Sequence, residues 1–285
     1  MTGLAGGDAM IPAVEAGGVS IPKLGIGTYM LTGETCVEAV AGGLRAGYRH
    51  VDTAEMYGNE TEVGAGIRAS GLPREDVFVT SKVWHEHLAS GVLEAAAEAS
   101  LTRLGLDQLD LYLIHWPSRQ VPLAEAMAGL CQVHKRGLAR AIGVSNFPAG
   151  MLREAIALAD VPLAVNQVEY HPYLDQSELL RVVRAAGLGL TAYCPLARGE
   201  ILGDPVVERI AESHGVTPAA VALAWLIGQD GVIAIPKSRN VARLAENLRA
   251  LDVTLDPSER AEITALAQPS GRMVRPAFAP DFEAG

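Results

Sequence analysis

Segments with the composition of β-strands alternate with segments of helical periodicity eight times along this chain, which restricts the fold more than any other feature. Segments 110–115 (DLYLIH) and 232–236 (VIAIP) are apolar almost throughout, as in parallel strands covered on both faces. The predicted strands end at Thr28, Asp52, Lys82, His115, Ser145, Tyr170, Cys194 and Lys237. The predicted helices cover 34–46, 60–70, 91–105, 122–136, 148–159, 176–186, 204–228 in two pieces, and 239–250.

Eight strand and helix units in a chain of 285 residues fit one closed barrel. No change of composition, linker or low-complexity tract divides them, which favours a (β/α)8 TIM barrel over an open doubly wound sheet. We expect residues 10–285 to form this single domain and residues 1–9 to be disordered. Segment 14–25 is predicted to form a hairpin across the barrel bottom, and 269–285 a short C-terminal tail after the last helix.

The charge and the cysteines exclude several classes of protein. The 33 acidic and 23 basic residues give a net charge of −10, so no general basic field would attract nucleic acid. Cys36, Cys131 and Cys194 are far apart and form no C-x-x-C motif, so we expect no disulfide framework and no metal. The chain has neither a signal-peptide pattern nor an apolar run of membrane-spanning length. We expect a cytoplasmic monomer that binds no membrane.

The polar residues that close the strands would gather at one rim of such a barrel, where barrel enzymes keep their active sites. Taken singly, Asp52 could be a helix cap, Lys82 a solvated lysine and His115 a hydrogen-bonded core histidine. Tyr57 could be a packing residue. Found together along successive strand ends, they indicate a site. The candidate rim residues are Thr28, Asp52, Tyr57, Lys82, His115, Ser145, Asn146, Gln167 to Tyr170, Tyr193, Lys237 and Ser238.

Four of these residues could protonate a carbonyl oxygen. Tyrosine is a weak acid at neutral pH, and we expect the ammonium of Lys82 to lower the pKa of Tyr57. Asp52 would keep that lysine charged and in place. A neutral His115 would orient the substrate oxygen toward the phenol. Because a carbonyl that gains a proton must also gain a hydride, the four residues predict carbonyl reduction. Glu55 and Glu60 are expected to be solvated.

Seven stretches of the chain resemble, in order, the motifs of the aldo-keto reductase family. They are HVDTAEMYGNE, VTSKVWHE, LYLIHWP, IGVSNF, VNQVEYHPYL, AYCPLARG and IPKSRNVARLAENL, and the sequence from residue 255 onward is similar to the ends of bacterial 2,5-diketo-D-gluconate reductases of the B type and methylglyoxal reductases. The resemblance implies that Asp52, Tyr57, Lys82 and His115 are the catalytic residues. It also implies a cofactor site containing Thr28, Ser145, Asn146, Gln167, Tyr193 and Leu196.

A phosphate site is predicted at the end of the last strand. No G-x-G-x-x-G motif lies between a strand and a helix, so a nicotinamide cofactor would be bound in another way. Cations beside helix N-terminal amides can hold a phosphate. Lys237, Ser238, Arg239 and Arg243 bring such groups together in an acidic chain, and the family resemblance assigns them to the 2′-phosphate of NADPH. By the same resemblance, Glu246 and Asn247 would contact the adenine.

Aromatic residues near Asp52, Tyr57, Lys82 and His115, here called the tetrad, are candidates for the substrate pocket. Tyr29, Trp84 and Trp116 follow the first, third and fourth strands, where packing into the rim is the alternative. The short tail resembles that of members with an open, shallow site. We therefore expect small polar carbonyls, such as diketogluconate and methylglyoxal, or simple and aromatic aldehydes.

Two other functions remain possible from the sequence. His85, His87 and His171 could be ligands of a metal-dependent barrel hydrolase. Such a site leaves Lys82 unexplained, and also the residues from Lys237 to Arg243, here called the basic cluster. Some barrels similar to this one act as NADPH-sensing modules without catalysis. Activity after addition of EDTA, and turnover of a panel of aldehydes, separate these possibilities from a reductase.

Overall fold

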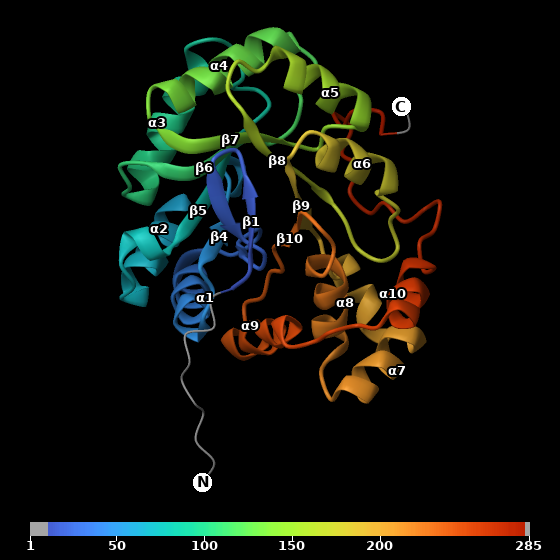
Figure 1. Ribbon diagram of the computed structural model, residues 1–285. Coiled ribbons are helices and arrows are strands. Elements are labelled where there is room, and N and C mark those ends of the chain that lie inside the picture. Colours follow the sequence, from blue (N-terminus) through green and yellow to red (C-terminus); the bar gives the residue numbers. More distant parts are fainter. Residues whose placement is uncertain (1–10, 283–285) are drawn as a thin grey trace.

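The computed structural model describes residues 11–282, in which eight parallel strands form a barrel (Figure 1). The predicted disorder of residues 1–9 lies outside this range. Each strand pairs with the next along the chain, and the sheet closes where the Gly25 amide donates to the Ala234 carbonyl (2.9 Å). This confirms the predicted (β/α)8 barrel. The strands are β3 (Ile26–Gly27), β4 (His50–Asp52), β5 (Phe78–Val83), β6 (Leu109–Ile114), β7 (Ala139–Ser145), β8 (Leu163–Glu169), β9 (Gly189–Tyr193) and β10 (Val232–Ala234).

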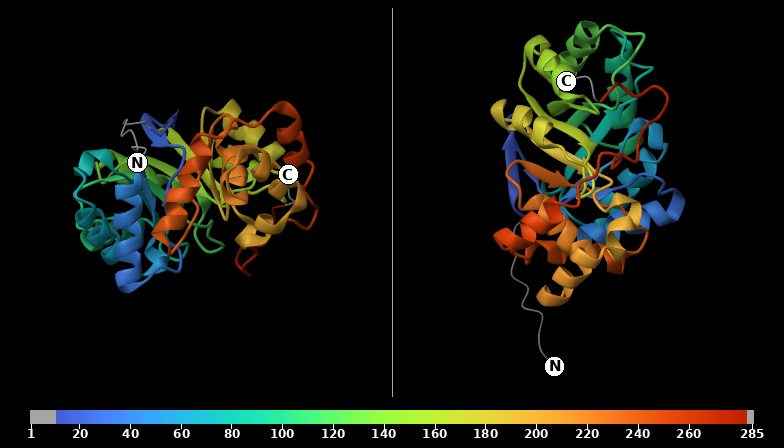
Figure 2. Two further views of the ribbon diagram at one scale, coloured as in Figure 1. Left: turned by 90° about the horizontal axis from the view of Figure 1, so that it is seen from below. Right: turned by 90° about the vertical axis from the view of Figure 1, so that its right-hand side faces the viewer.

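Helices surround the barrel and bury its outer face (Figures 1 and 2). The helices predicted from the sequence agree with the observed ones to within two residues at each end. They are α1 (Gly33–Ala46), α2 (Glu60–Ser70), α3 (Val92–Leu104), α4 (Leu123–Lys135), α5 (Ala149–Leu158), α6 (Ser177–Ala185), α7 (Pro205–His214), α8 (Pro218–Ile227) and α9 (Val241–Leu248). A further helix, α10 (Pro257–Thr264), begins at a capping box formed by Asp256 and Glu259.

An antiparallel hairpin closes the N-terminal end of the barrel, as predicted. It consists of β1 (Ala13–Ala16) and β2 (Val19–Pro22), drawn in blue in Figure 1. Alternate residues of the hairpin pack into the barrel interior against Phe78, Leu111 and Val165. At its turn Gly17 has φ +58°, and a Cβ there would lie 2.6 Å from the Cβ of Ala164, so only glycine fits. Because the hairpin fills the N-terminal end of the barrel, a functional site would lie at the carboxyl ends of the strands.

Within residues 11–282, no single helix is both long and apolar enough to cross a membrane. Helices α7 and α8 meet that length and composition only as a pair, bent by 92°. The α8 member of the pair lies in the core, where Val221, Leu223 and Leu226 are fully buried.

Candidate active site

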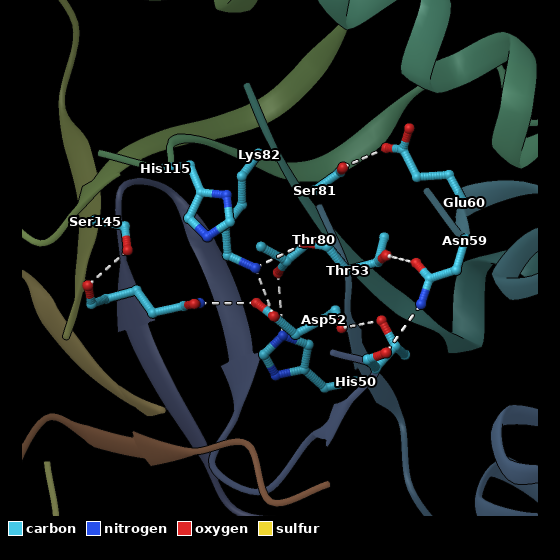
Figure 3. A network of polar contacts seen from close by, with 12 residues as sticks. His50, Asp52, Thr53, Asn59, Glu60, Thr80, Ser81, Lys82, His115 and Ser145 are labelled. Carbon is cyan, nitrogen blue, oxygen red and sulfur yellow. Dashed lines mark hydrogen bonds and ion pairs between the residues drawn. The ribbon is translucent and has the colours of Figure 1, made fainter. Parts of the chain in front are cut away.

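A buried ion pair lies at the carboxyl ends of β4 and β5. The Nζ of Lys82 is 2.6 Å from Oδ1 of Asp52 and also donates to the carbonyl of Thr53 (2.7 Å) (Figure 3). Lys82 is fully buried. Burial lowers the pKa of Lys82 from its ordinary value, and the adjacent Asp52 carboxylate opposes that shift. The lysine ammonium is therefore fixed by two oxygen atoms at the top of the barrel.

The second oxygen of Asp52 is also occupied. Nε2 of Gln167, from β8, donates to Oδ2 of Asp52 over 2.7 Å. The hydroxyl of Thr28 donates to the Asp52 backbone carbonyl (2.9 Å). One layer deeper, His50 Nε2 lies 3.1 Å from the Thr80 hydroxyl. The carboxylate is thus held by Lys82 from β5 and by Gln167 from β8, so its position depends on strands from different parts of the barrel.

Tyr57 is brought over this ion pair by the 3₁₀ turn η1 (Glu55–Tyr57), which follows β4. Lys82 Nζ lies 5.2 Å from the centre of the Tyr57 ring, and the His115 ring lies 5.6 Å from it in an edge-on arrangement. Next to the turn, buried Asn59 accepts from the Thr53 hydroxyl and donates to the carbonyls of Thr28 and Leu31. The structure thus brings Asp52, Tyr57, Lys82 and His115 together, and Asn59 fastens the loop that carries the tyrosine.

The predicted lowering of the pKa of Tyr57 is wrong in this structure. Burial, followed by the charge of Asp52, raises the pKa of Tyr57 well above its ordinary value. Burial and the nearby Lys82 ammonium keep the pKa of His115 well below its ordinary range. Near neutral pH the site therefore holds a protonated phenol beside a neutral imidazole.

The residues predicted to hold the nicotinamide adjoin the tetrad. Asn146 has φ +65° and donates through Nδ2 to the carbonyl of His115 (2.9 Å). The Tyr193 hydroxyl donates to Oδ1 of Asn146 (2.8 Å), and the Ser145 hydroxyl donates to the carbonyl of Gln167 (2.8 Å). Leu196, half-buried, follows β9. Amide and hydroxyl groups thus line one side of the four residues.

The basic cluster lies at the end of β10 and the start of α9. Lys237, Arg239 and Arg243 are exposed. The Ser238 hydroxyl accepts from the Asn240 amide (3.0 Å), and Asn240 caps α9 through the amide of Ala242. Further along α9, Glu246 is exposed and Asn247 is buried. Three cationic residues therefore lie just before α9 or in its first turn, and the phosphate site stays a prediction.

Aromatic rings form a wall beside the tetrad, and the C-terminal tail completes it. The Trp84 ring lies 5.4 Å from that of His115, and Phe278 packs edge-on against Trp84 (5.4 Å) and Trp116 (5.5 Å). The tail therefore adds an aromatic ring beside Trp84 and Trp116, a contact that the sequence did not predict. Tyr29 is half-exposed and lies 5.1 Å from Tyr57.

Phe278 was missed in the sequence, although a signal was present. The chain has four phenylalanines, and two of them, Phe278 and Phe282, stand in the short tail. Aromatic residues in a tail without helical or strand periodicity indicate a surface that they cover.

The two glutamates expected to be solvated are bound to neighbouring loops and strands. Glu60 is buried and accepts from the Ser81 hydroxyl and from Nε of Arg103 (2.7 Å). Glu55 accepts from the Trp84 amide (2.9 Å) and from His87 Nδ1 (2.9 Å). Both were wrongly placed because their partners, which lie on β5, on α3 and in the loop after β5, are distant in sequence.

The histidines considered as metal ligands are dispersed. His87 pairs with Glu55, His85 lies against the ring of Phe278 (4.3 Å), and buried His171 contacts a different glutamate, Glu169 (3.0 Å). In the part of the chain that the structure describes, no three His, Cys, Asp or Glu side chains are grouped as metal ligands would be.

The sequence over residues 23–268 matches the model of the aldo/keto reductase family. The chain belongs to this family. It is accordingly an oxidoreductase, and the family uses a nicotinamide cofactor.

Named relatives and solved structures agree with the family. Methylglyoxal reductase DkgB of Escherichia coli O157:H7 is 39% identical over 93% of this chain and 100% of its own length. Glyoxal reductase of Bacillus subtilis is 42% identical over 87% of this chain and 90% of its own. A crystal structure of a proposed 2,5-diketo-D-gluconic acid reductase B has a TM-score of 0.94 at 44% identity, covering 97% and 99% of the two chains. A Bombyx mori aldo-keto reductase in complex with NADP has a TM-score of 0.84 at 32% identity, covering 91% and 94%.

Proposed function

We propose that this protein reduces small polar carbonyl compounds to alcohols with NADPH, and that Tyr57 is the proton donor. The observation that carries the proposal is the arrangement of a protonated phenol above a buried Lys82–Asp52 ion pair, with a neutral His115 beside it. A fixed acid at the rim of a barrel fits protonation of an oxygen that develops negative charge.

Each member of the tetrad has a separate task in this proposal. His115 orients the carbonyl oxygen, and Tyr57 gives that oxygen its proton as negative charge develops there. The Lys82 ammonium, 5.2 Å from the Tyr57 ring centre, stabilises the phenolate that remains. Asp52 holds the ammonium in position through its 2.6 Å contact. The raised pKa of Tyr57 means that its proton is retained until the oxygen becomes basic enough to take it.

The donor groups at the rim fit a nicotinamide dinucleotide that carries a 2′-phosphate. Ser145, Asn146 and Gln167 offer amide and hydroxyl groups to a carboxamide, and the ring of Tyr193 lies beside them as a stacking surface. Thr28 and Leu196 would border the same site. Bound NADPH would supply the hydride to the carbonyl carbon. The adenine would lie near Glu246 and Asn247. The 2′-phosphate would be held by the basic cluster, which consists of Lys237, Ser238, Arg239 and Arg243.

The aromatic wall favours substrates that are flat or small. Tyr29, Trp84 and Trp116 would contact the part of the substrate that does not react. Methylglyoxal, glyoxal and diketogluconate are small polar carbonyls, and relatives named for their reduction support this choice. Benzaldehydes would use the aromatic faces.

The test is the rate of NADPH oxidation with methylglyoxal, diketogluconate, benzaldehydes and ketosteroids. We expect turnover of the first three and a kcat/KM with NADPH well above that with NADH. Equal kcat/KM values for the two cofactors would contradict the assignment of the basic cluster. Tight NADPH binding with no turnover of any carbonyl would instead favour the sensing module, and loss of activity in EDTA that zinc restores would favour a metal enzyme.

A further inference from the structure

A buried carboxylate at the end of β8 binds the backbone of the C-terminal tail. Glu169 is fully buried, and its two oxygens accept from the amides of Met273 (2.7 Å) and Val274 (3.0 Å). His171, also fully buried, contacts Oε1 from the other side (3.0 Å). Two consecutive backbone amides on one carboxylate fix both the place and the register of the tail at this point.

The tail is also held at a second point, a few residues before Met273 in the chain. The Gln268 amide donates to the carbonyl of Tyr173 over 2.9 Å. At Gly271 a Cβ would lie 1.8 Å from that same carbonyl oxygen, so the backbone passes too close for any side chain. Residues 268–274 therefore follow one path along the loop between β8 and α6.

The register set at Glu169 determines where Phe278 lies. Phe278 follows Val274 by four residue steps, and such a segment spans at most about 14 Å. Beyond it, Phe278 contacts Trp84 and Trp116, and Arg119 donates to the carbonyl of Ala279 (2.9 Å). The right-hand view of Figure 2 shows the tail, in red, running from the last helices toward the green segments. A displacement at Glu169 would therefore move the phenylalanine away from the wall.

We propose that Glu169 is a positioning residue for the reaction. It holds the C-terminal tail so that Phe278 completes the substrate wall formed by Trp84 and Trp116. His171 supports it by holding the carboxylate. The proposal rests on the function proposed above, because it gives the tail a role in substrate selection at the same site.

The charge of Glu169 is suited to this task. Burial by itself would raise the pKa of Glu169, but hydrogen bonds from His171, Met273 and Val274 outweigh burial and lower it. The carboxylate therefore stays ionised, with both oxygens accepting. A Glu169→Gln side chain has nearly the same shape but only one acceptor oxygen, and its NH2 group would face a backbone N–H. One of the two tail contacts must then be lost.

The first experiment measures the tail directly and needs no turnover. Hydrogen exchange at the Met273 and Val274 amides should be strongly protected in the wild type and at least about tenfold faster in Glu169→Gln. Glu178→Gln is the matched control, because Glu178 is an exposed residue on α6 whose nearest cation, Arg153, is 3.7 Å away. Unchanged protection in Glu169→Gln would overturn the proposal.

The second experiment measures substrate selection. In Glu169→Gln we expect the KM for benzaldehyde to rise roughly three- to tenfold, with the methylglyoxal KM, the kcat values and the Kd for NADPH nearly unchanged. Gly271→Ala, which blocks the seating of the tail without altering the carboxylate, should give the same pattern if Glu169→Gln does not fold. Phe278→Ala should reproduce it, and adding Glu169→Gln to Phe278→Ala should have little further effect.

The outcomes separate this proposal from the function on which it rests. A wild type that turns over no carbonyl contradicts the proposed function, while the exchange experiment still tests the contact between Glu169 and the tail. Equal changes of KM for both aldehydes, or additive effects of Glu169→Gln and Phe278→Ala, would contradict the role of Glu169 in selection.

Discussion

Nε2 of Gln167 donates to Oδ2 of Asp52 over 2.7 Å, which joins a predicted cofactor residue on β8 to a predicted catalytic residue on β4. Lys82 occupies the other oxygen of the same carboxylate. A side chain that contacts both the cofactor and Asp52 would make the position of Asp52 depend on whether the cofactor is bound. In the proposed function Gln167 would therefore have two tasks, which a substitution should reveal together.

We expect Gln167→Ala to lower kcat by roughly tenfold and to weaken NADPH binding by a similar factor, because a hydrogen bond to a buried charge is lost along with the carboxamide contact. Stopped-flow reduction and fluorescence titration of NADPH measure the two effects. A change in Kd alone would show that the contact with Asp52 has no catalytic importance.

Asn59 should be as important for the position of Tyr57 as for stability. Its three buried hydrogen bonds connect the loop after β4 to Thr28, Leu31 and Thr53. We expect Asn59→Ala to lower the free energy of unfolding by about 2–4 kcal/mol and kcat severalfold. Urea denaturation and steady-state kinetics test this. Gln108→Ala, which removes an exposed hydrogen bond to the Gly137 carbonyl, is the control and should change neither quantity appreciably.

The pH dependence of reduction follows from two opposite pKa shifts. In the proposed reaction Tyr57 acts as an acid while protonated, and its raised pKa keeps it protonated through the neutral range. His115 would act while neutral, and its lowered pKa keeps it neutral there. With saturating NADPH, kcat for reduction should be nearly flat between about pH 6.5 and 9. A rise or fall of kcat with pH inside this range, if it disappears when either residue is replaced, would contradict the assigned protonation states.

The basic cluster predicts how cofactor selectivity will change. Arg243→Ala should raise the Kd for NADPH about 10- to 100-fold and leave that for NADH nearly unchanged, because only NADPH carries the 2′-phosphate. Arg249→Ala is a matched control at the other end of α9, where Arg249 donates to the Gly215 carbonyl (3.1 Å). An equal increase of Kd for NADPH and NADH would contradict the assignment of the 2′-phosphate to the basic cluster.

The barrel and the members of the tetrad could be predicted because both depend on local pattern. Apolar strands alternating with amphipathic helices leave few ways to bury their apolar faces, and parallel strands place their last residues together. Asp52, Lys82 and His115 could therefore be grouped before any coordinates. The last strand was placed less well, since β10 ends at Ala234 rather than at Lys237.

The features that were missed depend on contacts between distant segments. The tail has no periodicity, and it is bound at Met273 by Glu169, more than a hundred residues earlier. The pKa of Tyr57 moves upward because the fold partly buries the residue and desolvates its phenol, which the presence of a lysine in the sequence cannot indicate. Glu60 has the sequence pattern of an ordinary surface residue, and only the fold brings Arg103 on α3 beside it.

The most direct test of the account is the kcat of Tyr57→Phe with NADPH and methylglyoxal, measured with the Kd for NADPH. We expect kcat to fall by about 10²- to 10⁴-fold while the Kd stays within a factor of two, because the variant loses only the acidic hydroxyl. Tyr29→Phe, which alters a neighbouring ring 5.1 Å from Tyr57, should retain nearly full activity. A Tyr57→Phe enzyme that keeps a substantial part of the wild-type kcat would contradict the assignment of Tyr57 as the acid.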